Sequence, residues 1–99
     1  MTETYTNGTW DVKDGEDEAF VAEWTAFVNW ASEQFGPRAF KLVRDVDRPS
    51  RYMSFAPWES RDAQAAWKAL PEFPERIGRV RSHCTNFEPS VFELVTAVG

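Results

Sequence analysis

Few side chains in this chain could carry acid–base or metal chemistry. The 99 residues include one histidine, His83, and one cysteine, Cys84. His83 is the only side chain with an ordinary pKa near neutrality, so it is a candidate catalytic residue. One histidine and one cysteine cannot by themselves complete a zinc or two-metal site, and the five scattered glycines form no phosphate-binding loop. We therefore expect a protein without a metal or nucleotide cofactor.

The chain is rich in aromatic side chains, which could line a binding pocket. Five Trp, eight Phe and two Tyr make up 15% of the chain, which is more than a disordered or linker protein would carry. The surplus predicts either an unusually aromatic core or rings that line a pocket or a subunit interface.

The charge and the length of the chain argue against nucleic-acid and membrane binding and for a single domain. Residues 1–36 hold one Lys against eight acidic residues, a net charge of −7, and residues 37–99 hold ten basic against eight acidic residues, a net charge of +2. An acidic chain without a basic, aromatic-interleaved stripe is a poor nucleic-acid ligand. No targeting segment and no apolar run long enough to cross a membrane is present. We expect one domain over residues 1–99, in a cytoplasmic protein that binds neither nucleic acid nor membrane.

The elements that must position these side chains follow from periodicity and turn residues. We expect strands over residues 4–13, 38–46, 51–56 and 90–98, helices over 16–35 and 60–70, and a further helix from Pro74. The first helix has one core-facing stripe, formed by Phe20, Val21, Trp24, Phe27, Val28, Ala31 and Phe35. Trp30 falls outside it, where it either covers neighbouring side chains or forms a pocket rim or dimer contact.

The later helices and the last strand show similar patterns. The helix over 60–70 has an apolar face formed by Ala63, Ala66, Trp67 and Leu70. On the next helix Arg76, Arg79 and His83 share a flank, which is either a solvated basic edge or an anchor for an anionic or phenolate-like group. The nearly continuous apolar run over 90–98 predicts a strand buried on both faces.

The element order predicts a ferredoxin-like α+β fold. Strand, helix, strand, strand, broken helix, strand gives a four-stranded antiparallel sheet with helices on one face. The third strand carries large apolar side chains on both faces, with Tyr52 on the side of Trp58 and Met53 on the side of Phe55. The face opposite the helices therefore needs a cover.

The segment over residues 54–60, SFAPWES, followed by a helix with Trp67 and by Pro71-Glu72-Phe73, carries a resemblance to a known family. It closely resembles the strand-to-helix junction of the antibiotic biosynthesis monooxygenase (ABM) family, and the similarity extends over nearly the whole chain. The resemblance implies a homodimer, a dimeric α+β barrel in which a second copy covers the open sheet face.

The resemblance also implies a reaction. Oxygenases of this family work without metal or flavin, because the deprotonated aromatic or polyketide substrate passes an electron to dioxygen in a dry aromatic pocket. Trp67 matches the family's helix tryptophan and would donate its indole N–H, although packing in the core is an equally simple role. The pocket walls would come from Phe27, Trp30, Tyr52 and Phe55, with Arg76 as the anchor and His83 as the titratable group.

The residues of this chain differ from two other patterns in the family, and a non-catalytic function is the alternative. Haem degradation is disfavoured, because Ile77 stands where the haem-binding members place their axial histidine. The asparagine that some aromatic-polyketide monooxygenases place four residues before the helix tryptophan is Ala63 here. The alternative to an oxygenase is a non-catalytic, stress-associated dimer that binds a small hydrophobic molecule, since it would need the same pocket.

Overall fold

The computed structural model describes residues 3–99. The elements in order are β1 (Thr4–Val12), α1 (Asp17–Phe35), β2 (Lys41–Arg44), β3 (Arg51–Trp58), α2 (Arg61–Lys68), α3 (Phe73–Arg81) and β4 (Cys84–Glu93). This βαββαβ order, with the second helix broken into α2 and α3, confirms the predicted ferredoxin-like α+β fold.

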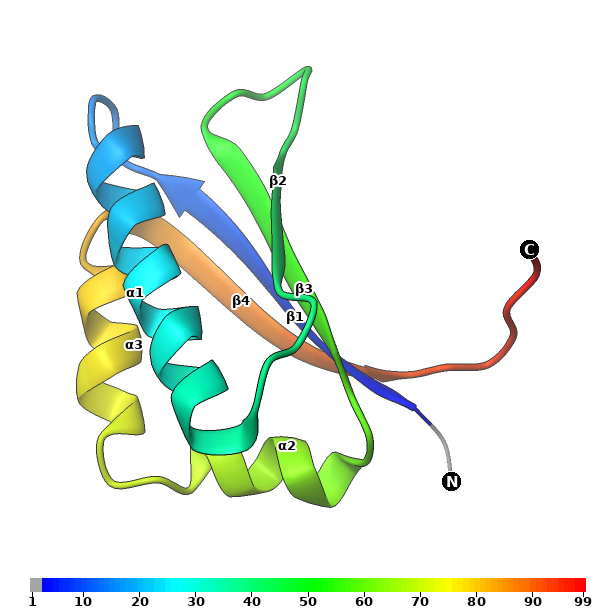
Figure 1. The fold of residues 1–99 in the computed structure, drawn as a ribbon. Coiled ribbons are helices and arrows are strands. Elements are labelled where there is room, and N and C mark those ends of the chain that lie inside the picture. Colours follow the sequence, from blue (N-terminus) through cyan, green and yellow to red (C-terminus); the bar gives the residue numbers. More distant parts are fainter. Residues whose placement is uncertain (1–2) are drawn as a thin grey trace.

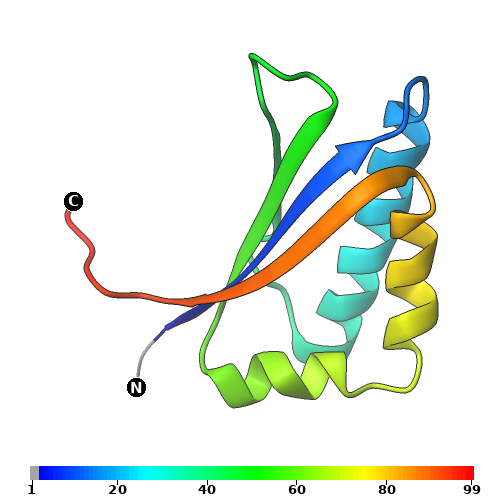
Figure 2. The same ribbon diagram turned by 180° about the vertical axis from the view of Figure 1, so that it is seen from behind.

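One antiparallel sheet forms the centre of the molecule, with the strand order β2-β3-β1-β4. Helices α1 and α3 lie side by side along one face, and α2 crosses one end of it (Figures 1 and 2). Within the part of the chain that the structure describes, no helix covers the opposite face. The helix-facing side holds the even-numbered residues of β1 and β3, of which Trp10, Tyr52, Ala56 and Trp58 are buried.

Local signals in the sequence set the element ends. Helix α1 ends at Gly36, whose φ of 87° suits glycine and whose N–H donates to the Ser32 carbonyl. The link between β2 and β3 contains an Asx turn, in which the Asp45 carboxylate accepts from the N–H groups of Asp47 and Arg48. Strands β2 and β3 pair antiparallel as neighbours in the sheet, and β2 is shorter than the expected strand over 38–46.

The core lies between the sheet and the helices and is built around indole rings. All five tryptophans are buried, each with 8% or less of its surface exposed. They pack with Phe20, Phe27 and Val80 in one continuous cluster. The structure thus shows an unusually aromatic core, the first of the two alternatives that the surplus of aromatic residues predicts.

The predicted face of α1 was wrong at two positions. Val21, assigned to the core stripe, is 41% exposed, whereas Trp30, assigned to the flank, is only 4% exposed. The reason is that α1 packs against α3 as well as against the sheet, so its buried arc extends toward α3. Arg76 of α3 lies over the Trp30 ring, 4.8 Å from its centroid.

The last strand was also predicted in the wrong place. It spans Cys84–Glu93 rather than 90–98, and it continues through Pro89 because β4 is an edge strand and pairs only with β1. Residues 94–99 extend away from the domain as a tail (Figure 1). Val95 and Val98 are 88% and 98% exposed, so burial of this run on both faces does not occur within one chain.

The sheet face opposite the helices is partly apolar. Phe55 lies on it next to Asn7 of β1, and Met53 lies two residues away along β3, opposite Thr9. Met53, Val43 and Phe92 are the large exposed apolar residues of the sheet on this side. Within residues 3–99, no helix is long and apolar enough to cross a membrane.

Candidate functional site

A pocket lies between the helix-facing side of the sheet and the three helices. It encloses about 50 Å³ and widens toward solvent, with about 490 Å³ of space between the atoms when the open mouth is included. Its walls are mostly aromatic and aliphatic, and they come from every element except β2. The residues that line the pocket include Gly8, Trp10, Phe27, Phe40, Ser54, Phe55, Gln64, Trp67, Lys68, Phe73, Ile77 and Phe87. An apolar cavity with a few polar groups is the usual form of a small-molecule site.

Gly8 forms a part of the pocket wall where neighbouring side chains lie close to its backbone. A Cβ atom at this position would meet Trp10 Nε1 at 2.9 Å, Phe87 at 3.0 Å and Ser54 Oγ at 3.0 Å. The indole of Trp10 donates to Ser54 Oγ over 2.9 Å, and its ring stacks on Phe87 with centroids 3.9 Å apart. A side chain at position 8 would therefore disturb both the hydrogen bond and the stack.

The ring of Trp67 forms another wall and is held on several sides. It stacks on Trp58, with centroids 5.3 Å apart and an interplanar angle of 21°. Phe27 and Phe73 each lie 5.1 Å from it, and Phe40 lies 5.9 Å away. These contacts fix the direction of the indole N–H before any ligand binds.

Two buried donors of helix α2 have no hydrogen-bond partner. They are Nε1 of Trp67 and Nε2 of Gln64, and both residues line the pocket. Gln64 is only 3% exposed. A buried polar group without a partner costs about 1–3 kcal/mol, so such groups are uncommon in folded proteins. A bound molecule that supplies acceptors would recover this energy.

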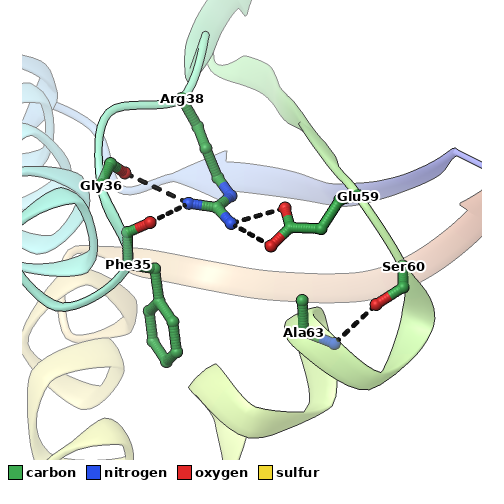
Figure 3. A network of polar contacts seen from close by, with 6 residues as sticks. All are labelled: Phe35, Gly36, Arg38, Glu59, Ser60 and Ala63. Carbon is green, nitrogen blue, oxygen red and sulfur yellow. Dashed lines mark hydrogen bonds and ion pairs between the residues drawn. The ribbon is translucent and has the colours of Figure 1, made fainter.

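The start of α2 is fixed by a polar network around Arg38 (Figure 3). Its guanidinium donates to the carbonyls of Phe35 and Gly36 at 2.7 and 3.2 Å, and to both carboxylate oxygens of Glu59 at 2.9 and 2.6 Å. The Ser60 hydroxyl accepts from the Ala63 N–H at 3.1 Å and so caps α2. The network joins the end of α1 to the start of the helix that carries both donors.

The pocket offers hydrogen-bond donors but no side chain suited to act as a base at neutral pH. Among its lining residues only Lys68 is ionisable, and Lys68 is exposed. Among residues 3–99, no three His, Cys, Asp or Glu side chains gather where they could hold a metal ion. The arrangement can bind an aromatic molecule and stabilise negative charge on its oxygen atoms.

The structure brings three of the predicted site residues together. Phe27, Phe55 and Trp67 line the pocket. Trp30 does not, because it lies between α1 and α3 beneath Arg76. Arg76 is outside the pocket for the same reason, since its guanidinium covers the Trp30 ring.

The other two predicted residues lie elsewhere. The Tyr52 hydroxyl donates to the Asp17 carboxylate over 2.6 Å. The pKa of Tyr52 is raised, mainly because the hydroxyl is buried and to a lesser extent because of this hydrogen bond. His83 follows α3 and lies 2.8 Å from Glu16, measured from Nδ1 to Oε1. Neither residue lines the pocket.

Gln64 was not among the predicted site residues. The helical periodicity predicted Ala66 on the buried face of α2, whereas Ala66 is exposed and Gln64 is buried. Helical periodicity gives weight to apolar residues, so a buried amide is read as part of the polar side. The available signal was its position three residues before Trp67, which places both side chains on one helix face.

Comparisons with known proteins agree with this geometry. A family model described as "Antibiotic biosynthesis monooxygenase" matches residues 5–76. No curated protein matches the chain.

Solved structures share the fold. A variant of SnoaB from Streptomyces nogalater, described as a cofactor-independent oxygenase, is 22% identical with a TM-score of 0.85, and the match covers 97% of this chain and 96% of that one. A conserved protein from Methanosarcina mazei is 11% identical with a TM-score of 0.80, covering 93% and 92%. Protein SO0527 from Shewanella oneidensis is 16% identical with a TM-score of 0.80, covering 97% and 94%.

Proposed function

Since this chain belongs to the antibiotic biosynthesis monooxygenase family, we propose that it is a cofactor-independent monooxygenase that acts on a small aromatic or polyketide-like molecule. The substrate would bind in the pocket between the sheet and the helices. The similarity to SnoaB supports the reaction class, and the aromatic walls support the substrate class.

The observation that carries this proposal is the unpartnered indole N–H of Trp67. It is a buried donor in a pocket with aromatic walls, and four neighbouring rings hold it in place. A fixed donor in a water-poor site stabilises negative charge that develops on a substrate oxygen. It therefore favours the phenolate or enolate form of the substrate over the neutral form.

The chemistry can then proceed on the substrate itself. In an anthrone-type substrate the ionised form passes one electron to dioxygen, and the two radicals combine to give a hydroperoxide at the ring carbon. Loss of water leaves a carbonyl, so that a CH2 group and O2 become a C=O group and H2O. Because no lining residue is a suitable base, the substrate proton passes to water, and the protein contributes binding, exclusion of water and charge stabilisation.

Oxygen consumption tests the proposal directly. Chelator-treated, flavin-free protein is given a panel of phenols and anthrones, and oxygen uptake is followed with an electrode. We expect uptake with at least one substrate, with one atom of 18O2 retained in the product. Tight binding without uptake for any member would instead favour the non-catalytic, ligand-binding protein.

We also propose that the protein is a homodimer with the open sheet face at its interface. Met53, Val43 and Phe92 are 43%, 43% and 54% exposed on that face, and large exposed apolar patches commonly mark interaction sites. Phe55 belongs both to this face and to the pocket lining. A second copy packed against this face would cover these apolar side chains.

A further inference from the structure

Gln64 is a polar side chain in a position that the fold does not require to be polar. It is 97% buried, it lies on the face of α2 that meets the pocket, and most of the side chains that line the pocket with it are aromatic or aliphatic. An amide carries two N–H donors and one carbonyl acceptor. Its Nε2 has no hydrogen-bond partner among residues 3–99. Core packing alone would be served as well by Met or Leu.

Gln64 and Trp67 form a pair of donors. They are three residues apart on α2, a spacing that places side chains next to each other on one helix face. Their two nitrogens are half of the four unpartnered buried side-chain nitrogens in residues 3–99, the others being Arg38 Nε and Trp58 Nε1, which lie outside the pocket lining. Both unpartnered donors of α2 line the pocket, so a molecule bound there can supply their acceptors.

The remaining polar groups of the pocket set the chemistry of that ligand. Ser54 Oγ accepts from the Trp10 indole. The other uncharged polar side chains of the lining are those of Thr6, Asn7 and Ser90. Among residues 3–99, no carboxylate lines the pocket, and its one charged residue, Lys68, is a cation. The complementary molecule carries oxygen acceptors, and two oxygens would give each of the two donors on α2 its own partner.

We propose that Gln64 is a substrate-binding residue whose amide binds a second oxygen of the substrate, so that the pocket selects aromatic molecules with two oxygen substituents over those with one. The role in orienting a substrate for oxygenation depends on the proposed function, whereas the binding preference does not. A site built to hydrogen-bond an oxygen discriminates strongly against an analogue that lacks it, because the donor is then left unpaired.

Anaerobic binding measurements test this inference without any turnover. The probes are 1,8-, 2,3- and 1,3-dihydroxynaphthalene, each compared with 1-naphthol and 2-naphthol by titration calorimetry. We expect at least one diol to bind the wild-type protein tenfold to a hundredfold more tightly than the better naphthol. Gln64→Met should bring this ratio close to one and change naphthol affinity by less than about threefold, because it keeps the side-chain volume.

Two further variants keep the test decisive. Gln64→Glu has nearly the same shape but removes the donors, and it should also abolish the preference. Gln34→Met, at an exposed position of α1, should leave it unchanged. Equal affinities for diols and naphthols in the wild-type protein, or a preference retained in both Gln64 variants, would overturn the inference. A clear preference for diols without oxygen uptake would contradict the proposed function but not the binding role of Gln64.

Discussion

Trp58, the last residue of β3, stacks on Trp67 of α2, with their ring centroids 5.3 Å apart. On the other side of Trp58, the guanidinium carbon of Arg38 lies 4.1 Å from the ring centroid. The segment between the two tryptophans contains Glu59 and Ser60, which bind Arg38 and cap α2. The most recognisable part of the sequence therefore positions the donor helix against the pocket.

Replacing Arg38 should lower the stability of the protein. Arg38→Lys keeps the charge but loses the planar fork that joins Phe35, Gly36 and Glu59, so we expect unfolding free energy in urea to fall by about 1–3 kcal/mol. Glu59→Gln is the control. It should cost less, because the Glu59 side chain is 62% exposed, whereas that of Arg38 is 10% exposed. Equal losses for the two variants would show that the buried contacts to the α1 carbonyls contribute little.

Replacing glycine by alanine should change the free energy of unfolding in opposite directions at positions 8 and 78. Gly8→Ala places a Cβ within 3.0 Å of Trp10 Nε1 and should lower unfolding free energy by about 1–3 kcal/mol. Gly78→Ala, in an exposed part of α3 with no atom within 4 Å of the new Cβ, should raise it by about 0.5–1 kcal/mol. Chemical denaturation measures both. A stable Gly8→Ala protein with unchanged ligand affinity would contradict the close packing of the pocket wall.

Cys84 should make stability fall at alkaline pH. Burial, with a smaller effect of Asp11, raises the pKa of the Cys84 thiol to about 11, whereas an unfolded thiol has a pKa near 8.5. The folded state therefore keeps a proton that the unfolded state loses, so this contribution is complete below about pH 8.5 and is lost as the pH rises toward 11. Between pH 8 and 10, wild-type stability should decline more steeply than that of Cys84→Ala. Parallel pH profiles would refute the assignment.

The fold was predictable from the sequence because its signals are local. Turn residues such as Gly36 and Asp45 mark the element ends, and the order of elements leaves few topologies. Errors arose where a second packing partner decides burial, as for Trp30 between α1 and α3. The pocket was predicted in part, through Phe27, Phe55 and Trp67, because those residues lie on recognisable faces. Gln64 could not be found by periodicity, since only tertiary packing shows that this amide is buried.

The oligomeric state should depend on the open face of the sheet. Light scattering at micromolar concentration should give about twice 11.4 kDa. Met53→Lys places a charge in the proposed interface and should weaken dimerisation at least tenfold. Val46→Lys, at a 91% exposed position in the β2–β3 loop, is the control and should leave the mass unchanged. A wild-type monomer, or a Met53→Lys dimer of normal stability, would contradict this interface.

The rate of oxygen uptake by Trp67→Phe, measured beside that of Trp30→Phe, tests whether the Trp67 indole acts on the substrate. Both variants remove a buried indole and should lose similar stability, but only Trp67 lines the pocket. With chelator-treated, flavin-free protein and an anthrone, we predict that Trp67→Phe lowers the rate of the chemical step tenfold to a thousandfold, whereas Trp30→Phe stays within about threefold of wild type. Equal rates for the two variants, or wild-type uptake that vanishes on chelation and returns with iron or copper, would contradict the account.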